Sequence, residues 1–149
     1  MGRRIIVATV VWLAACSNDV NFQQTSPFVG EWSCIQNESQ QFPDATGTGL
    51  PTRLRYVITS PEQGQLVVAS EGDAGSCAFQ FSAQGGDAML LAGQSCQNLG
   101  GMTLAYTSGS ASVAGEKLTM TFHYDISGAG TAGAPGASGT GVMTDDCTR

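Results

Sequence analysis

An unbroken alternation of apolar and polar residues constrains the fold of this chain more than any other feature. It runs from Lys117 to Ser127 and places Leu118, Met120, Phe122, Tyr124 and Ile126 between polar neighbours. Successive side chains of a β-strand point to opposite faces, so a period of two predicts a strand with one buried face. The chain is therefore expected to build its core from strands.

Other segments repeat this signal. Residues 52–60 place Leu54, Tyr56 and Ile58 on one face and Arg53 and Arg55 on the other, which predicts a second half-buried strand. Further short strands are expected at residues 28–36, 65–70, 77–81, 88–92, 102–107 and 138–147, and residues 108–114 are compatible with a strand. Residues 37–51 and 93–100 are interpreted as loops because they are polar or rich in glycine.

The composition supports an all-β fold. The chain contains 20 glycines, only 12% charged residues and no convincing helix after its N-terminal segment. About 8–10 short strands at regular spacing favour a small antiparallel up-and-down β-barrel, since closure removes exposed sheet edges. A two-sheet β-sandwich is the alternative.

The N-terminus carries a processing signal. Arg3 and Arg4 precede an apolar run of 11 residues from Ile5 to Ala15, too short to span a bilayer as a helix. The run ends in Leu13-Ala14-Ala15-Cys16, which resembles the lipobox of bacterial lipoproteins at all four positions. The resemblance implies cleavage between Ala15 and Cys16 and a diacylglyceryl group on the Cys16 sulfur. A plain secretory signal and a buried core strand are the alternatives.

This resemblance implies a domain plan and a location. Residues 1–15 would be a signal peptide, 16–27 a lipidated flexible tether and 28–149 one β-barrel domain. The lipid on Cys16 would attach the protein to a membrane of the cell envelope. Ser17 permits sorting to the outer membrane, where an aspartate would retain the protein at the inner membrane.

The net charge of the mature chain limits the kinds of partner that are expected. Removal of Arg3 and Arg4 leaves 4 basic and 12 acidic residues, so the mature net charge is 4 − 12 = −8. Nucleic acids and anionic lipid head groups are therefore not expected as partners, because both require a basic surface.

The remaining cysteines are expected to form disulfides. Cys34, Cys77, Cys96 and Cys147 are an even number in an oxidising compartment, and four cysteines allow three connectivities. Cys77 and Cys96 flank a predicted hairpin, and Cys34 and Cys147 lie near the two ends of the domain. We expect the pairs Cys77–Cys96 and Cys34–Cys147. A metal site is not expected, since no close cysteine pair is present and His123 is far from any cysteine in sequence.

Two further resemblances bear on the fold. Gly30 and Trp32 near the start of the domain resemble the Gly-x-Trp signature of lipocalins, which implies a tryptophan that plugs the closed end of a barrel. The wider layout resembles uncharacterised lipoproteins of δ-proteobacteria, including myxobacteria. That layout combines Gly30, Trp32 and Cys34 with Cys77, Gly93, Cys96 and Cys147. This second resemblance implies a fold and a location, and no activity.

Catalytic and metal-binding patterns are weak. His123, Asp125 and Ser127 share one strand face, but a solvated face is the simpler interpretation. Glycoside hydrolysis needs two carboxylates close together, and the sequence does not indicate that any two acidic residues are neighbours. The candidates are Glu31, Glu38, Asp44, Glu62, Glu71 and Asp73. Asp145, Asp146 and Asp125 lack a calcium-loop pattern. Arg53 and Arg55 are interpreted as surface cations among acids. No enzyme activity and no cofactor are expected.

The barrel interior is the better candidate for function. Six aromatic residues are expected to line a cavity or to fill a core: Trp32, Tyr56, Phe79, Phe81, Phe122 and Tyr124. A barrel of about eight strands either fills with side chains or holds one small ligand. The sequence is thus interpreted as a non-enzymatic envelope lipoprotein with a structural or interaction role, in which an envelope protein would be the partner. Lipocalin-like binding of a small apolar ligand is the alternative.

Overall fold

The computed structural model describes residues 26–71, 77–97, 101–128 and 138–149, and these residues form an all-β structure. It contains ten strands: β1 (Gly30–Phe42), β2 (Ala45–Thr48), β3 (Thr52–Thr59), β4 (Gln65–Glu71), β5 (Ala78–Gln84), β6 (Asp87–Leu90), β7 (Ser95–Gln97), β8 (Thr103–Ala114), β9 (Lys117–Ser127) and β10 (Ser138–Thr148). The predicted signal segment and most of the predicted tether lie outside the described residues. Within the described ranges, no helix is long and apolar enough to cross a membrane.

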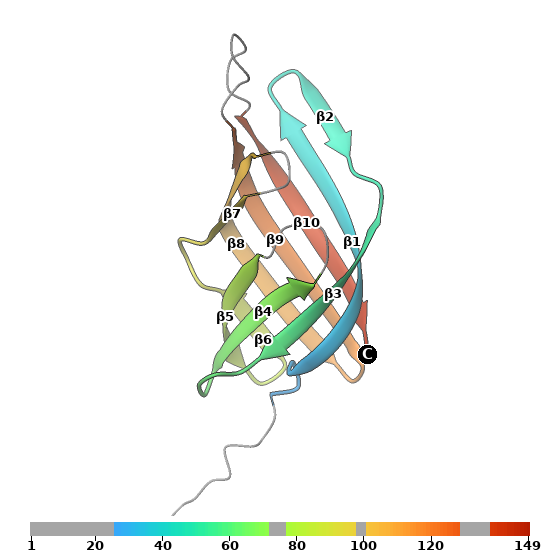
Figure 1. Ribbon diagram of the computed structural model, residues 1–149, viewed down its shortest axis with the longest axis vertical. Helices are drawn as coiled ribbons and strands as arrows, with labels where there is room; N and C mark the ends of the chain where they lie inside the picture. The colour runs from blue at the N-terminus through green and yellow to red at the C-terminus, as the bar shows by residue number, and fades with distance from the viewer. Residues whose placement is uncertain (1–25, 72–76, 98–100, 129–137) are drawn as a thin grey trace, which may run out of the picture.

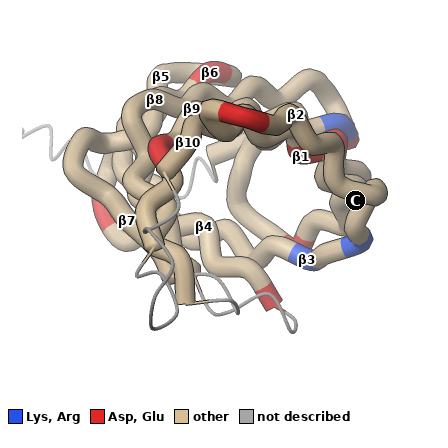
Figure 2. The backbone as a smooth tube through the Cα atoms, turned by 90° about the horizontal axis from the view of Figure 1, so that it is seen from above, with Lys and Arg blue, Asp and Glu red and all other residues tan. Residues whose placement is uncertain are grey.

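Eight of the strands close into an antiparallel barrel. Each barrel strand pairs with the next one along the chain, from β1 through β3, β4, β5, β6, β8 and β9 to β10. β10 then pairs with β1 over the register Ser33↔Thr148 to Gln41↔Thr140, which closes the ring seen from above in Figure 2. The predicted up-and-down barrel is confirmed, and the described strands do not form the alternative two-sheet sandwich.

The segment interpreted as a polar loop, residues 37–51, is mostly strand. β1 continues to Phe42, turns, and returns as β2, which pairs with the distal half of β1. β3 pairs with the proximal half of β1, and the break at residues 49–51 separates the two pairings. The loop prediction was wrong because the inward face of this half of β1 is polar, so no apolar alternation marks it.

Two other boundaries differ from the prediction. Residues 95–97 form the short strand β7 rather than a loop, and β7 pairs with Thr103–Ala105 at the start of β8. β8 itself runs through Ala114, so the segment of small residues after 107 belongs to a strand. The strand predicted from Lys117 to Ser127 has the same bounds in the structure.

Apolar side chains are buried inside the barrel toward the end where β1 begins and β10 ends, which is the lower end in Figure 1. The largest fully buried residues there and in the middle of the barrel include Trp32, Phe28, Phe81, Phe122, Ile58, Leu66, Leu118 and Met120. The aromatic rings of Phe79 and Phe81 both contact Phe122, with centroid distances of 4.9 and 5.8 Å. These aromatic contacts are part of one continuous cluster of buried side chains.

Trp32 closes the lower end. Its ring is fully buried, and its Nε1 donates a hydrogen bond of 2.7 Å to the carbonyl of Phe28. Gly30, two residues earlier, has a φ of 135°, which a residue with a Cβ rarely adopts. The expectation that a tryptophan plugs this end is met, and glycine at position 30 is required by the backbone turn that leads into β1.

Candidate functional site

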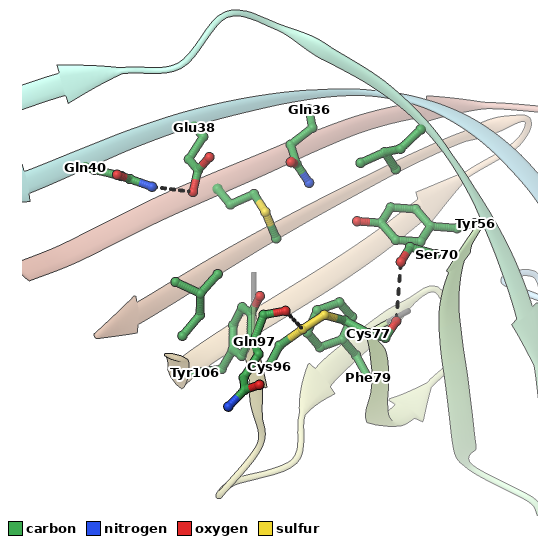
Figure 3. Close-up of a pocket in the computed structure, with 13 residues that line it drawn as sticks. Gln36, Glu38, Gln40, Tyr56, Ser70, Cys77, Phe79, Cys96, Gln97 and Tyr106 are labelled. Atoms are coloured by element: carbon green, nitrogen blue, oxygen red, sulfur yellow. Dashed lines mark hydrogen bonds between the residues drawn. A yellow bond between two sulfur atoms is a disulfide. The ribbon is translucent and has the colours of Figure 1, made fainter. Parts of the chain in front are cut away.

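A pocket occupies the upper end of the barrel. Its volume is about 290 Å³, near the lower end of the roughly 300–1,000 Å³ that ligand pockets usually have. Its described lining comes mainly from β1, β3, β4, β5, β7, β8 and β10. The lining residues are Gln36, Glu38, Gln40, Leu54, Tyr56, Ser70, Cys77, Phe79, Cys96, Gln97, Leu104, Tyr106 and Met143. Figure 3 shows these side chains converging on one space.

One wall of the pocket is polar and comes from a single strand. Gln36, Glu38 and Gln40 occupy alternate positions of β1, continue the inward face that begins with Trp32 and Cys34, and are partly buried. The Glu38 Oε1 accepts a hydrogen bond of 2.9 Å from Gln40 Nε2. Glu38 is the one charged side chain in the described lining, so the pocket presents a negative charge on this wall.

A tyrosine from β9 holds the same carboxylate. The hydroxyl of Tyr124 donates a hydrogen bond to Glu38 Oε1. To reach β1, the Tyr124 ring crosses β10 over Gly141, its register partner, where an added Cβ would overlap the ring. Glycine at position 141 therefore makes the contact between Tyr124 and Glu38 possible. Burial and the bond to Glu38 raise the pKa of Tyr124, which keeps its hydroxyl protonated as a donor.

A second carboxylate lies within the barrel beside the pocket. Asp145 on β10 is fully buried, lies opposite Gln36 in the strand register, and accepts a hydrogen bond of 2.8 Å from the Tyr56 hydroxyl. Its other oxygen, Oδ1, has no hydrogen-bond partner among the described residues. Burial raises the pKa of Asp145 to about 6, although the side chains of Tyr56 and Gln36 lower it. An unpartnered buried oxygen is costly and is rare in folded proteins.

The opposite wall is aromatic and apolar. Tyr106 packs edge-on against Phe79 with a centroid distance of 4.9 Å, and both rings line the pocket. Burial raises the pKa of Tyr106 to about 12, with smaller contributions from the negative charges of Glu38 and Asp145. The hydroxyl of Tyr106 has no hydrogen-bond partner in the described part of the chain. It is available to a bound molecule.

Both expected disulfides are present. Cys77 and Cys96 are joined, line the pocket, and connect the start of β5 to β7 across its rim. Cys34 and Cys147 are joined at a Cα–Cα distance of 4.0 Å, where they face each other across the first and last strands. This second disulfide lies inside the barrel below the polar wall. It fixes the seam that carries Gln36, Glu38 and Asp145.

The six aromatic residues predicted to line a cavity or fill a core divide between the two roles. Tyr56 and Phe79 line the pocket. Trp32, Phe81 and Phe122 belong to the filled core. Tyr124 is buried and reaches the pocket only through its hydrogen bond to Glu38.

The candidate residues for catalysis or calcium binding do not assemble. His123, Asp125 and Ser127 are exposed on the outer face of β9. Asp145 points inward whereas Asp125 and Asp146 are exposed on the outside, so these three acids cannot share one ion. No group of three metal-ligating side chains occurs among the residues with described positions.

The other acids and the two arginines of β3 lie outside the pocket. Arg55 forms ion pairs with Glu31 and Glu71 on the outer surface, as expected for a surface cation among acids. Arg53 is also exposed on that face. Asp44 and Glu62 are exposed, whereas Asp73 lies outside the described residues. Of the acids considered for glycoside hydrolysis that have described positions, only Glu38 lines the pocket.

Sequence reasoning missed Gln36, Gln40 and the inward direction of Glu38 and Asp145. A signal was present, because Glu38 has the same parity as Trp32 and Cys34 along β1, and Asp145 has the same parity as Cys147 along β10. A residue two or four positions from a buried cysteine on the same strand shares its face. The positions of the disulfide cysteines therefore indicated that both carboxylates point into the barrel.

Comparisons with known proteins give no family. No family model, no curated protein and no solved structure matches this chain.

Proposed function

We propose that this chain is a non-enzymatic binding protein of the bacterial cell envelope, which holds a small molecule in the upper pocket of its barrel. The observation that carries the proposal is the pocket itself: about 290 Å³ of space beside a core of buried apolar side chains. A barrel that served only as a rigid support would gain stability by filling this space with side chains. Instead, hydrogen-bonding groups and aromatic rings surround it.

The lining favours a ligand with an apolar body and one polar end. Leu104, Met143 and Phe79 offer apolar surface, whereas Glu38 and its neighbours on β1 offer hydrogen bonds. Apolar walls with a few convergent polar groups are typical of small-molecule sites. A purely structural or interaction role on the outer surface remains the second candidate. The exposed Ile35, Leu50 and Met89 favour it, but they lie on different strands or loops.

Native mass spectrometry of the full chain, purified from membranes in detergent, tests the binding function. We expect wild-type protein to carry a co-purifying small molecule. Met143→Trp should abolish this, because residue 143 lines the pocket and a larger ring would fill it. Val142→Trp is the matched control, since its side chain lies on the outside of the same strand. Wild-type protein that carries nothing after extraction from its native membrane, and that binds no probe, would contradict the proposal.

The membrane anchor is proposed separately, on the motif Leu13-Ala14-Ala15-Cys16. A lipid on Cys16, left by cleavage after Ala15, would attach the protein to the envelope, and Ser17 is compatible with the outer membrane. The described chain enters the barrel beside Trp32 at the lower end, whereas the pocket lies at the upper end.

Labelling tests the anchor without reference to the pocket. With radiolabelled palmitate in a Gram-negative host, we expect label in wild-type protein and none in the Cys16→Ser variant. Globomycin should cause the unprocessed precursor to accumulate. Absence of label in the wild type, together with no precursor accumulation, would contradict the anchor and leave the binding proposal standing.

A further inference from the structure

The charge of the pocket points to one class of ligand. We propose that the pocket binds a small organic cation, an amine or amidine with an apolar body, whose positive group pairs with Glu38. This inference rests on the proposed binding function and specifies the polar end of the ligand. It is carried by four features of the described residues.

The first feature is the balance of charge in the lining. Thirteen described residues line the pocket, and among them Glu38 is charged whereas none is lysine, arginine or histidine. Asp145, fully buried and bonded to the lining residue Tyr56, adds a second carboxylate behind the wall. An anionic ligand such as a fatty acid would meet like charge with no cation to offset it.

The second feature is the state of the Glu38 carboxylate. Tyr124 and Gln40 both donate to Oε1, which fixes the orientation of the group. Oε2 accepts no hydrogen bond from a described residue, and Glu38 is only partly buried on the pocket wall. A carboxylate oriented by two donors, with one oxygen left over, is prepared to accept a charge-assisted hydrogen bond from an N–H group.

The third feature is the unused acceptor capacity around the carboxylate. The Tyr56 hydroxyl donates its proton to Asp145, so it can offer only its lone pairs to a molecule in the pocket. Asp145 Oδ1 accepts no hydrogen bond of normal geometry from a described residue although Asp145 is fully buried, and the Gln36 side chain interacts with both Tyr56 and Asp145. One amide thus serves two buried acceptors, whereas an ammonium or amidinium group brings several donors.

The fourth feature is the aromatic wall opposite. Phe79 and Tyr106 line the pocket across from β1, as Figure 3 shows. Aromatic faces attract cations, and the attraction strengthens where water is excluded. The same rings would contact the apolar body of an amine whose charged end reaches Glu38.

A matched set of three probes tests this inference by isothermal titration of the full chain at neutral pH. The probes are 3-phenylpropan-1-amine, 3-phenylpropan-1-ol and 3-phenylpropanoate, which share one apolar body and differ in the charge of the end group. We expect the amine to bind about tenfold more tightly than the alcohol, and the carboxylate to bind weakest.

Variants then assign the preference to the carboxylate. Glu38→Gln should lower the affinity for the amine about tenfold and leave the alcohol unchanged, since the amide keeps the shape and the acceptor oxygen. Glu31→Gln, on the outer face of the same strand, is the matched control and should change neither affinity. Leu54→Lys, at a partly buried lining position, gives a second route if the glutamine variant unfolds, and it should abolish the preference for the amine.

The outcomes separate this inference from the function on which it rests. Equal affinity for amine and alcohol, tighter binding of the carboxylate, or an unchanged preference in Glu38→Gln would overturn the cation assignment while the binding function stands. Binding of none of the three probes, combined with no co-purifying molecule, would overturn both.

Discussion

The guanidinium carbon of Arg149 lies 4.4 Å from the ring centroid of Trp32, so the last residue of the chain stacks on the residue that plugs the lower end. The same guanidinium donates hydrogen bonds to the carbonyls of Pro27 and Val29, at 2.6 and 3.1 Å. One side chain therefore ties the end of the barrel to the segment that enters it. The contact combines a cation–π interaction with two charge-assisted hydrogen bonds.

Arg149→Ala should lower the free energy of unfolding by about 1–2 kcal/mol, because it removes all three interactions. Arg149→Lys should fall between wild type and alanine, since an ammonium keeps the charge but lacks the planar fork of donors. Chemical denaturation with disulfides intact measures both. Lys117→Ala, an exposed cation on β9, is the control and should change stability by less than about 0.5 kcal/mol. An alanine variant at 149 as stable as that control would show that the three interactions together contribute nothing to stability.

The disulfide between Cys34 and Cys147 should be the stronger of the two covalent ties. It closes a separation of 113 residues, against 19 for Cys77–Cys96. In the chain-entropy model, these loops correspond to about 4–5 and about 3 kcal/mol of stability. The double variant Cys34→Ala/Cys147→Ala should therefore lose more stability than Cys77→Ala/Cys96→Ala in the same denaturation experiment. The reverse order would mean that the pocket rim, and not the seam between β1 and β10, limits unfolding.

How much of the fold could be predicted depends on which half of the barrel a residue occupies. The inward positions of β9 and β3 are apolar along their whole length, so alternation located β9 from Lys117 to Ser127 and the inward face of β3 correctly. In the upper half, inward positions of β1 are Gln36, Glu38 and Gln40, and their outward neighbours are polar as well. A strand with two polar faces has no hydrophobic period, which is why residues 37–51 were interpreted as a loop.

The same reasoning explains what was missed at the pocket. Tyr56 and Phe79 were predicted because aromatic residues on a core face are visible in the alternation. Asp145 was not, because an aspartate is assigned to the surface unless a partner is known, and its partner Tyr56 is 89 residues away. Long-range pairing across a closed barrel brings these residues together. Only the strand register of the closed sheet shows that the two residues are neighbours.

Gly141→Ala should separate Tyr124 from Glu38. An added Cβ would overlap the Tyr124 ring, so either the ring or β10 must move. We expect a loss of stability of about 1–3 kcal/mol, as for other overpacked sites. Because Glu38 raises the pKa of Tyr124, the variant should also lower the pKa of one tyrosine in a spectrophotometric titration.

The control for this variant is Gly47→Ala on β2, where an added Cβ would meet no atom within 4 Å. That change should leave both the stability and the tyrosine titration close to wild type. If Gly141→Ala behaves like the control, then Tyr124 does not depend on glycine at position 141 for its approach to β1.

Asp145 should make the protein less stable at neutral pH than in mild acid. Its pKa is raised from 3.8 to about 6, because burial disfavours the charged form more than the interactions with Tyr56 and Gln36 favour it, and the charges of Asp146 and Glu38 act in the same direction as burial. The folded state therefore binds this proton more tightly than the unfolded state does. The contribution of Asp145 is fully present below about pH 4 and is lost as pH rises through about 6, a change on the order of 3 kcal/mol.

Asp145→Asn isolates this contribution, because asparagine keeps an acceptor for Tyr56 and carries no charge. We expect the variant to be more stable than wild type at pH 7–8 by up to about 3 kcal/mol, and the difference to shrink toward zero near pH 4. Denaturation at a series of pH values measures it, with Asp146→Asn, which is exposed on the outer face next to it, as the control. A difference between wild type and Asp145→Asn that does not vary with pH would contradict a buried carboxylate with a raised pKa. A variant less stable than wild type at pH 7 would instead mean that the ionised carboxylate is already compensated inside the barrel.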